Sequence, residues 1–206
     1  MIFEYKGIRP VIHPSAFIHP QANVTGNVTV GADVYVGPGA VLRGDWGAII
    51  VKDGCNVQEN CVVHIFPGKS VILEENAHIG HGAIIHGAHI GKNALVGMNA
   101  VIMDDVKIGD NCIVGALSFV PSEFESPKNQ LIIGNPASCR KTIPDLMIQW
   151  KREGTNLYQQ LARECHTVLK ECTPLTEPSE DKTDVDLSHY LTWPSYKNAN
   201  TDKGEP

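Results

Sequence analysis

Histidine side chains that could bind a metal ion gather in the stretch HIGHGAIIHG (residues 78–87), which contains His78, His81 and His86. Imidazole nitrogens are common ligands of Zn²⁺ and related ions. His81 and His86 stand five positions apart, which places them on opposite faces of a strand and about 140° apart on a helix. One segment therefore does not bring both to one ion, and the elements that carry them must be identified first.

Aliphatic residues recur at intervals of about six along most of the chain. They are Ile18, Val24, Val30, Val36 and Leu42; Val51, Val57 and Val63; Leu73, Ile79 and Ile85; and Ile90, Val96, Ile102, Ile108, Val114 and Val120. A small residue usually follows four positions later, including Cys55, Cys61 and Cys112. This is the hexapeptide signature of a β-helix, in which three units make one coil of a triangular prism. We therefore expect an all-β fold with inward-facing aliphatic columns.

The two ends of the chain depart from the repeat. We expect residues 1–12 to form a hairpin cap that turns near Lys6 and Gly7, followed by the β-helix over 13–140. Thr142 is a possible N-cap for a C-terminal α-helix over 142–172. Residues 173–206 are polar and contain prolines that include Pro174, Pro178 and Pro194, so we expect a mobile tail.

The predicted C-terminal helix has two internal features. Gly154 and Thr155 are expected to break or kink it. Its packing face is expected to be an apolar stripe of Leu157, Leu161, Val168 and Leu169.

Insertions between repeats determine which residues stack on successive coils. Counting whole coils places Leu42, Val63, Ile85 and Ile102 in one vertical column. The residues that follow them then stack on the outer side, so that His64 lies beside His86, with Arg43 one coil below. Neighbouring coils are about 4.8 Å apart. His64 and His86 are therefore a plausible pair of metal ligands from one chain.

A second column places His81 elsewhere. Val57 stacks under Ile79, and Glu59 under His81, so His81 belongs to a different face or corner from His64 and His86. If all three histidines share one ion, His81 must come from another subunit. A cyclic homotrimer with a metal site at each interface fits this division. Three neutral imidazoles with an open position filled by water is the pattern of catalytic zinc sites.

Four motifs resemble the γ-class carbonic anhydrase family of hexapeptide proteins. They are LRGDWG (42–47), NVQEN (56–60), VVH (62–64) and HIGHGAIIHG (78–87). The resemblance implies a left-handed parallel β-helix, with His64, His81 and His86 as the metal ligands. It also implies that the neighbouring subunit supplies His81.

The same resemblance suggests roles for four further side chains. Arg43 and Asp45 would form an intersubunit pair beside the site, Gln58 would orient the bound water or substrate, and Glu59 would assist the reaction. Each has a simpler interpretation. Arg43 and Asp45 could form an ordinary turn salt bridge, and polar residues such as Gln58 and Glu59 are common on β-helix surfaces.

The chain is closest to the branch of this family that contains the phenylacetic acid degradation protein PaaY and the carnitine operon protein CaiE. The segments IGKNALVGMNAVIMD (90–104), LIIGNPA (131–137) and WKREGTNLYQ (150–159) carry this similarity. PaaY-type proteins are thioesterases that remove dead-end CoA thioesters. Carbonic anhydrases of the prototype form carry a proton-shuttle glutamate in an acidic loop. The corresponding segment here, HIFPGKSVIL (64–73), contains no acid.

Several functions remain open at this point. The first is a zinc-dependent thioesterase that cleaves acyl-CoA thioesters by means of metal-activated water. The second is a carbonic anhydrase acting on CO₂ and bicarbonate, the third a non-catalytic accessory protein of an acyl-CoA pathway, and the least favoured a hexapeptide acyltransferase. Fe²⁺ or Co²⁺ could replace zinc because imidazole accepts all three ions. The sequence does not identify the acyl group of the substrate.

The remaining histidines are less clearly connected with a functional site. His78 is expected to be exposed or to support the ligands from behind, and His89 has no assigned role. Surface positions are expected for His13, His19, His166 and His189. Phe66 and the Pro67–Gly68 turn could form a wall of the substrate entrance or a plain loop, and Tyr158 could reach the site from the helix.

The composition argues against several other classes of protein. The net charge is −6 and the excess of acids lies mainly in the tail, so no basic face for nucleic acid is expected. No apolar run approaches the roughly 18–20 residues that cross a bilayer. The N-terminus lacks the features of a signal peptide. The six cysteines contain no CxxC, which indicates reduced thiols rather than a zinc–cysteine site. We expect a cytoplasmic protein.

Overall fold

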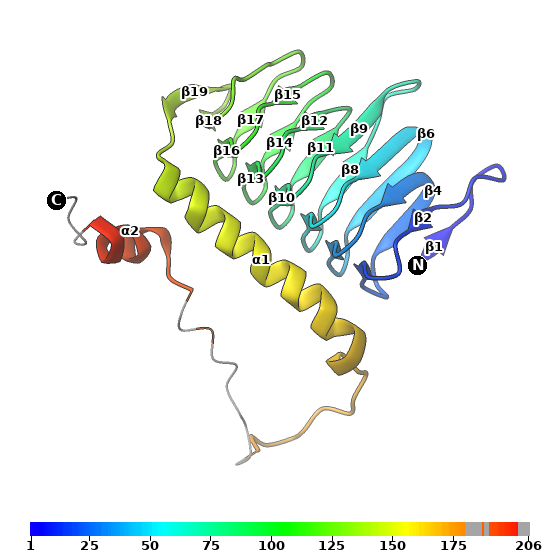
Figure 1. Cartoon of the computed structure of the whole chain (residues 1–206). Coiled ribbons are helices and arrows are strands. Elements are labelled where there is room, and N and C mark those ends of the chain that lie inside the picture. Colours follow the sequence, from blue (N-terminus) through cyan, green and yellow to red (C-terminus); the bar gives the residue numbers. More distant parts are fainter. Residues whose placement is uncertain (180–186, 188–189, 202–206) are drawn as a thin grey trace.

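Stacked coils form a triangular β-helix in the computed structural model, which describes residues 1–179, 187 and 190–201 (Figure 1). Each coil contributes short strands to three faces, named here A, B and C. Every strand pairs in parallel with its neighbours except the final pair, β18 and β19. The predicted parallel β-helix is therefore confirmed.

The strands belong to the faces as follows. Face A contains β1 (Ile2–Phe3), β8 (Val62–His64), β11 (Ile84–His86), β14 (Val101–Ile102) and β17 (Phe119–Val120). Face B contains β2 (Val11–Ile12), β9 (Ser70–Leu73), β12 (His89–Ile90) and β15 (Lys107–Ile108). Face C contains β3 (Phe17–Ile18), β5 (Tyr35–Val36), β7 (Asn56–Val57), β10 (His78–Ile79), β13 (Leu95–Val96), β16 (Ile113–Val114), β18 (Gln130–Gly134) and β19 (Ala137–Thr142).

Two longer strands, β4 (Asn23–Val30) and β6 (Val41–Val51), continue around the corner from face A to face B. The corner is tight. A Cβ atom at Gly44 would lie 2.5 Å from the carbonyl oxygen of Asn27, so the chain requires glycine there. This close approach fixes the segment that carries Arg43 and Asp45 against the coil below.

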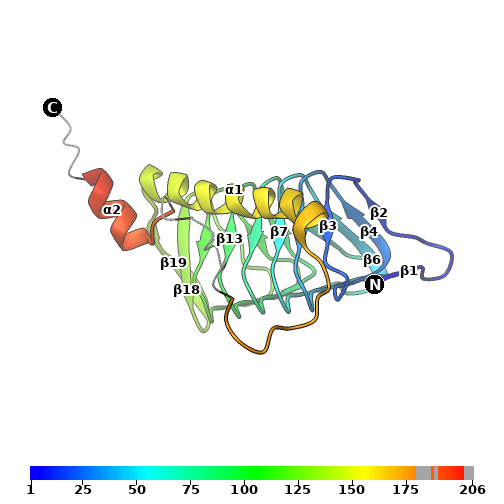
Figure 2. The ribbon, with the colours of Figure 1, turned by 90° about the horizontal axis from the view of Figure 1, so that it is seen from below.

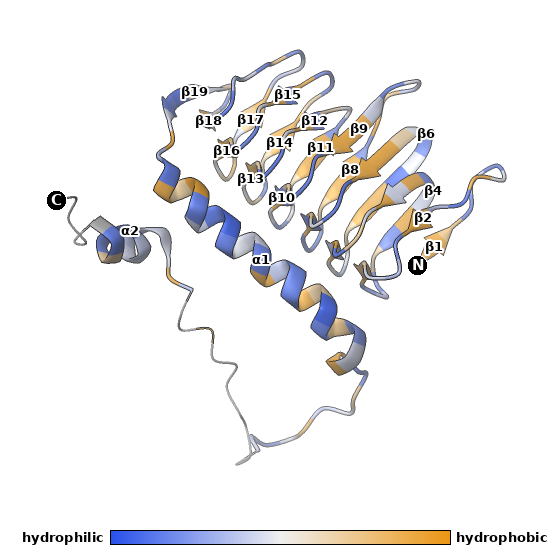
Figure 3. Ribbon diagram, in the orientation of Figure 1, coloured by the Kyte–Doolittle hydropathy of each residue, from blue (hydrophilic) through white to orange (hydrophobic). Residues whose placement is uncertain are grey.

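The core is the column of aliphatic residues that the repeat predicts. Leu42 pairs with Val63, Val63 with Ile85, and Ile85 with Ile102. All four side chains are fully buried. The small position is occupied as predicted by buried Cys55, Cys61 and Cys112, whose thiols are free. Figure 3 shows the strands largely in the hydrophobic colour, while α1 is mixed.

Asparagines at one set of corners adopt the left-handed conformation, which asparagine tolerates better than most residues. Asn93, Asn111 and Asn129 have φ of 53°, 56° and 61°. Their side chains form a ladder, because Asn93 Nδ2 donates to Asn111 Oδ1 at 2.9 Å and Asn111 Nδ2 to Asn129 Oδ1 at 3.0 Å. The ladder joins three successive coils.

The N-terminal segment turns where the sequence predicts. Tyr5 and Ile8 form an antiparallel bridge around Lys6 and Gly7. The flanking strands β1 and β2 do not pair with each other but add in parallel to β4.

Helix α1 (Asp145–Val168) runs along face C for much of the length of the β-helix (Figures 1 and 2). It begins at Asp145, after the predicted start, because Thr142 pairs with Gln130 at the end of the β18–β19 hairpin. The predicted break at Gly154 and Thr155 is wrong. The helix is continuous there, and the missing side chain of Gly154 makes room for the Tyr190 ring.

The predicted apolar stripe on α1 is also wrong. Leu161, Val168 and Leu169 are exposed, and the buried residues of the helix are Lys151, Gly154, Thr155 and Ala162. The reason is the surface that the helix covers, since Lys151 donates to Asn76 and Asn93 and Thr155 lies against His78. Polar partners on the coils therefore select Lys151 and Thr155, while Ala162 packs with Phe17 and Tyr35.

A second helix, α2 (Trp193–Thr201), lies in the polar tail, part of which falls outside the described residues. Aromatic contacts hold it to α1. The ring of Trp150 stacks on Tyr190 and tilts against Trp193, and Trp150 Nε1 donates to the Leu191 carbonyl at 2.8 Å. In the described part of the chain, no helix has the length and apolar character needed to cross a membrane.

Lys151 links α1 to the coils. Its Nζ donates to the Asn76 carbonyl at 2.6 Å and to Asn93 Oδ1 at 2.9 Å, and the residue is 2% exposed. Burial lowers the pKa of the amine to about 7. The folded protein therefore disfavours the charged amine.

The change Lys151→Met tests this link. The unfolded amine has a pKa of about 10.4, so between about pH 7 and pH 10 the unfolded chain binds more protons than the folded chain. The free energy of unfolding of the wild type should therefore rise with pH over this window, by up to about 4 kcal/mol from this group. Urea unfolding of wild type, Lys151→Met and the exposed control Lys92→Met at both ends of the window measures the rise. An unchanged rise in Lys151→Met would contradict the account.

Candidate metal centre

His64 and His86 lie side by side at the ends of β8 and β11. They are partners in the parallel register, as the stacking of coils predicts. Their ring centroids are 5.3 Å apart, and His64 Nδ1 lies 3.3 Å from His86 Nε2. Each imidazole therefore turns one nitrogen toward the other.

The second nitrogen of each ring faces a carboxylate. His64 Nε2 lies 3.0 Å from Asp45 Oδ1, and His86 Nδ1 lies 2.8 Å from Asp104 Oδ1. A carboxylate accepts hydrogen bonds, so these two nitrogens carry the ring protons when the imidazoles are neutral. The nitrogens that face each other are then both unprotonated, with two lone pairs directed at the same space.

This arrangement fits a divalent metal ion. In tetrahedral zinc sites with Zn–N distances of about 2.0–2.1 Å, two ligand nitrogens are about 3.3–3.4 Å apart, which matches the separation between His64 and His86. Metal-binding histidines usually donate their other N–H to a carboxylate or carbonyl oxygen, as both do here. Within the described residues, no group of three His, Cys, Asp or Glu side chains is close enough to hold an ion. One chain thus places two well-oriented candidate ligands together.

Asp45 is held as an anion. Its Oδ2 accepts from Arg43 Nη1 at 2.6 Å, within one chain. Partial burial raises the pKa of the Asp45 carboxyl, but the hydrogen bonds from His64 and Arg43 lower it further, and the net pKa lies below the ordinary value. The Trp46 ring packs 5.2 Å from the His64 ring, and the Arg43 guanidinium lies 5.8 Å from the Trp46 ring.

His81 has a similar carboxylate partner in a different place. Its Nδ1 lies 2.5 Å from Glu59 Oε2, and Glu59 Oε1 accepts a hydrogen bond from the Tyr35 hydroxyl at 3.0 Å. The His81 side chain is 47% exposed. Its Nε2 is therefore the nitrogen available to a ligand outside the chain. Burial, followed by the charge of Glu59, raises the pKa of Tyr35, so its hydroxyl stays protonated as a donor.

The predicted site thus falls into two halves at the two long edges of face A. His81 lies in the turn between β10 on face C and β11 on face A, whereas His64 and His86 lie where face A ends and face B begins. The structure places Arg43 and Asp45 with the His64 half. It places Gln58 and Glu59 with the His81 half.

Gln58 and His78 lie beneath α1. Gln58 is buried, and its Nε2 lies 2.6 Å from His78 Nε2. His78 Nδ1 lies 3.4 Å from Thr155 Oγ1 on α1, and its ring packs against Tyr158. His78 is therefore held between face C and the helix. Tyr158 contacts this cluster and Tyr35, not the His64 pair.

The sequence did not predict two residues that orient the side chains of the candidate site. Asp104 partners His86, and Tyr35 partners Glu59. A signal for Asp104 was available, since Ile85 stacks under Ile102 and Asp104 follows two positions later. Tyr35 gave no such signal, because its contact with Glu59 depends on side-chain length across a corner.

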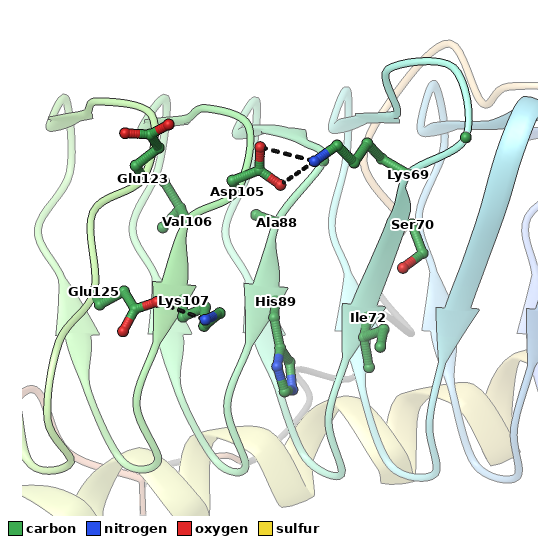
Figure 4. A pocket seen from close by; sticks show the side chains of 12 residues that line it. Lys69, Ser70, Ile72, Ala88, His89, Asp105, Val106, Lys107, Glu123 and Glu125 are labelled. Atoms are coloured by element: carbon green, nitrogen blue, oxygen red, sulfur yellow. Dashed lines mark hydrogen bonds and ion pairs between the residues drawn. The ribbon is translucent and has the colours of Figure 1, made fainter.

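A hollow on face B is separate from both halves (Figure 4). Its cations are paired with carboxylates on neighbouring coils. Lys69 Nζ lies 2.9 Å from Asp105 and Lys107 Nζ lies 2.5 Å from Glu125. His89, exposed at its side, contacts Glu74 at 3.1 Å. These pairs form a solvated ladder of charges. Of the other histidines, His13 and His166 are exposed, His19 is half-buried, and His189 lies outside the described residues.

Comparison with known proteins gives consistent relatives. The bacterial transferase hexapeptide model of six repeats matches residues 9–44 and 87–122. The chain is 48% identical over 180 residues to the carnitine operon protein CaiE of Escherichia coli K12, covering 87% of this chain and 92% of that protein. It is 47% identical over 180 residues to CaiE of Salmonella agona, covering 87% and 91%.

Two solved structures share the fold over nearly their whole length. One is a Bacillus cereus protein described as a candidate acetyltransferase, with a TM-score of 0.81, 33% identity, and coverage of 82% of this chain and 98% of that one. The other is a hexapeptide transferase family protein from Anaplasma phagocytophilum, with a TM-score of 0.77, 29% identity, and coverage of 80% and 97%.

The change Asp104→Ala should weaken metal binding without breaking the coil. It removes the acceptor that fixes the His86 ring, and loss of such a partner typically costs about 10–100-fold in affinity. Competition titration with a chromogenic chelator measures the dissociation constant for Zn²⁺. Asp105→Ala is the matched control because Asp105 is adjacent but pairs with Lys69. Equal affinities for the two variants would refute the role of Asp104.

Proposed function

The chain belongs to the hexapeptide-repeat family, in the γ-carbonic anhydrase-like branch that contains CaiE, and on this premise we propose that it is a metal-dependent hydrolase of acyl-CoA thioesters. The observation that carries the proposal is the geometry of His64 and His86. Two unprotonated nitrogens face each other at 3.3 Å, and a carboxylate orients the opposite nitrogen of each ring. Such a donor set suits Zn²⁺, with Fe²⁺ or Co²⁺ as alternatives.

The ligand set would be completed across a subunit interface. Nε2 of His81 from a neighbouring copy would join His64 Nδ1 and His86 Nε2, giving three imidazoles. When bound, the ion would act as a Lewis acid that polarises a carbonyl group and lowers the pKa of water to about 7.

The surface between the two halves supports a homotrimer. The outer side of face A carries an apolar column from successive coils, in which Val62 is 38% and Ile84 is 40% exposed. Val41, Val101 and Phe119 continue the column in register. An apolar stripe of this kind indicates a contact surface. Because one half-site lies at each edge of face A, a cyclic trimer would bring unlike halves together three times.

We assign positioning roles to the carboxylates. Asp45, Asp104 and Glu59 each accept a hydrogen bond from one of the three histidines, and so direct the free nitrogen outward. Arg43 keeps Asp45 ionised. These residues would act on the reaction through the ligands and not by direct proton transfer.

The surroundings of the His64 half favour an acyl substrate over CO₂. Trp46 is 52% and Phe66 is 58% exposed, which leaves apolar surface next to the ligands. The loop that carries Phe66 is held to Trp46, since Gly68 N donates to the Trp46 carbonyl at 3.0 Å. An apolar acyl group could pack here. The loop offers no carboxylate to move protons, which a fast carbonic anhydrase needs.

A hexapeptide acyltransferase is the second candidate. The observation in its favour is the 33% identical Bacillus cereus structure, described as a candidate acetyltransferase. An acyltransferase would pass the acyl group of CoA to an amine or hydroxyl acceptor instead of water. A non-catalytic accessory role in an acyl-CoA pathway is the outcome if neither hydrolysis nor transfer occurs.

Activity assays with metal-loaded protein test the proposal. Acetyl-, phenylacetyl- and carnitinyl-CoA are offered with and without amine acceptors, and CO₂ hydration is measured in parallel. The carnitine compound is included because the CaiE relatives are carnitine operon proteins. We expect free CoA to appear without an acceptor. His64→Ala should reduce turnover more than about 100-fold, because removing a ligand costs more than removing its carboxylate partner.

His89→Ala serves as the control, since His89 lies on face B and its side chain contacts Glu74. Thioester cleavage that persists in His64→Ala would rule out the metal-dependent mechanism. CoA release that requires an amine would favour the transferase.

A further inference from the structure

A polar cluster lies beneath α1 in a place where a β-helix and a helix would ordinarily bury apolar side chains. Asn56 and Thr155 are fully buried and Gln58 is 2% exposed. His78 and Tyr158 complete the cluster. His78 has no role in the proposed reaction as described above. Gln58 and Glu59 are consecutive, and Glu59 holds His81, so the cluster adjoins the His81 half of the site.

The hydrogen bonds fix the tautomer of His78. The hydroxyl of Thr155 donates to the Lys151 carbonyl one helical turn earlier, at 3.3 Å. A hydroxyl has one proton, so Thr155 Oγ1 can only accept from His78 Nδ1. His78 then carries its proton on Nδ1 and has an unprotonated Nε2. Burial, with the nearby charge of Lys151 and then of His81, lowers the pKa of His78 to about 3, which keeps the ring neutral.

The tautomer in turn fixes the amide of Gln58. An unprotonated His78 Nε2 requires a donor, which the Gln58 Nε2 group supplies at 2.6 Å. The second hydrogen of that group goes to Asn56 Oδ1 at 2.9 Å. Both amide hydrogens are used, so Gln58 Oε1 is left as an acceptor.

The cluster is not built for stability alone. Asn56 Nδ2 is buried without a hydrogen-bond partner. An unsatisfied buried donor is destabilising, so its presence calls for an explanation such as a functional role. Asn56 is in the position needed to take the second hydrogen of Gln58.

We propose that His78 is a positioning residue, whose Nε2 holds the Gln58 amide so that Oε1 accepts a hydrogen bond from the attacking water at the shared site. This rests on the proposed hydrolase function. Gln58 can act there only as an acceptor, and its orientation is set from α1 through Thr155 and His78. Helix α1 thus acts on the site that its subunit helps to build.

Two substitutions at His78 separate this role from a structural one, using the full chain loaded with zinc. His78→Met keeps the volume but offers Gln58 no good acceptor, and should lower kcat about 10-fold, the order of one lost hydrogen bond, with KM and zinc content unchanged. His78→Gln restores an acceptor near the position of Nε2, and should recover kcat to within about 3-fold of the wild type. His89→Gln is the control on face B and should match the wild type.

The outcomes distinguish this inference from the proposed function. A wild type that cleaves no thioester defeats the proposed function. An active wild type with kcat unchanged in His78→Met, or with His78→Gln as impaired as His78→Met, overturns the positioning role. A purely structural role would lower Tm in both variants without restoring kcat in His78→Gln.

Nitrogen-15 NMR of histidine-labelled wild type gives a readout independent of turnover. It should show His78 as the neutral Nδ1–H tautomer down to about pH 5, since a ring with its pKa lowered to about 3 does not take up a second proton there. The Nε2–H tautomer would overturn the inference whatever the activity.

Discussion

In-register parallel pairing between successive coils is the constraint on which every other feature depends. Each residue lies directly above a known residue of the coil below, about 4.8 Å away. The buried column from Leu42 to Ile102 fixes this register, because a slip of one residue would turn the aliphatic side chains outward. The pairing of His64 with His86 is a direct consequence of the same register.

A second consequence is the placing of carboxylates. Asp45 and Asp104 lie close enough to the His64–His86 pair to take one nitrogen of each ring. The β-helix therefore holds two candidate ligands at one edge of face A and a third, His81, at the other. A rigid stack holds these edges apart, so a single chain does not bring the three together. In the proposed trimer, assembly is therefore required for function, because each half of the site is incomplete by itself.

The repeat made much of this predictable. Register, core, the small inward cysteines and the His64–His86 pair all follow from counting coils, since the six-residue period determines position on the prism. What surrounds the prism did not follow. The packing face of α1 could not be predicted from its apolar residues, because the coils present polar partners to it. Lys151 donates to Asn76 and Asn93, and Thr155 lies against His78. His78, expected to be exposed or to support the ligands from behind, is held beneath α1.

Sharing of one site by two subunits is the central claim, and mixed assembly tests it most directly. His64→Ala and His81→Ala subunits are each expected to form trimers without intact sites. In trimers reassembled from an equal mixture, an interface is intact when a His81→Ala subunit supplies His86 and His64 and a His64→Ala subunit supplies His81. Random assembly makes about one interface in four intact. The account predicts that zinc content and thioester cleavage return to about a quarter of the wild-type level. Zinc content and thioester cleavage in the mixture that do not exceed those of the separate variants would contradict it.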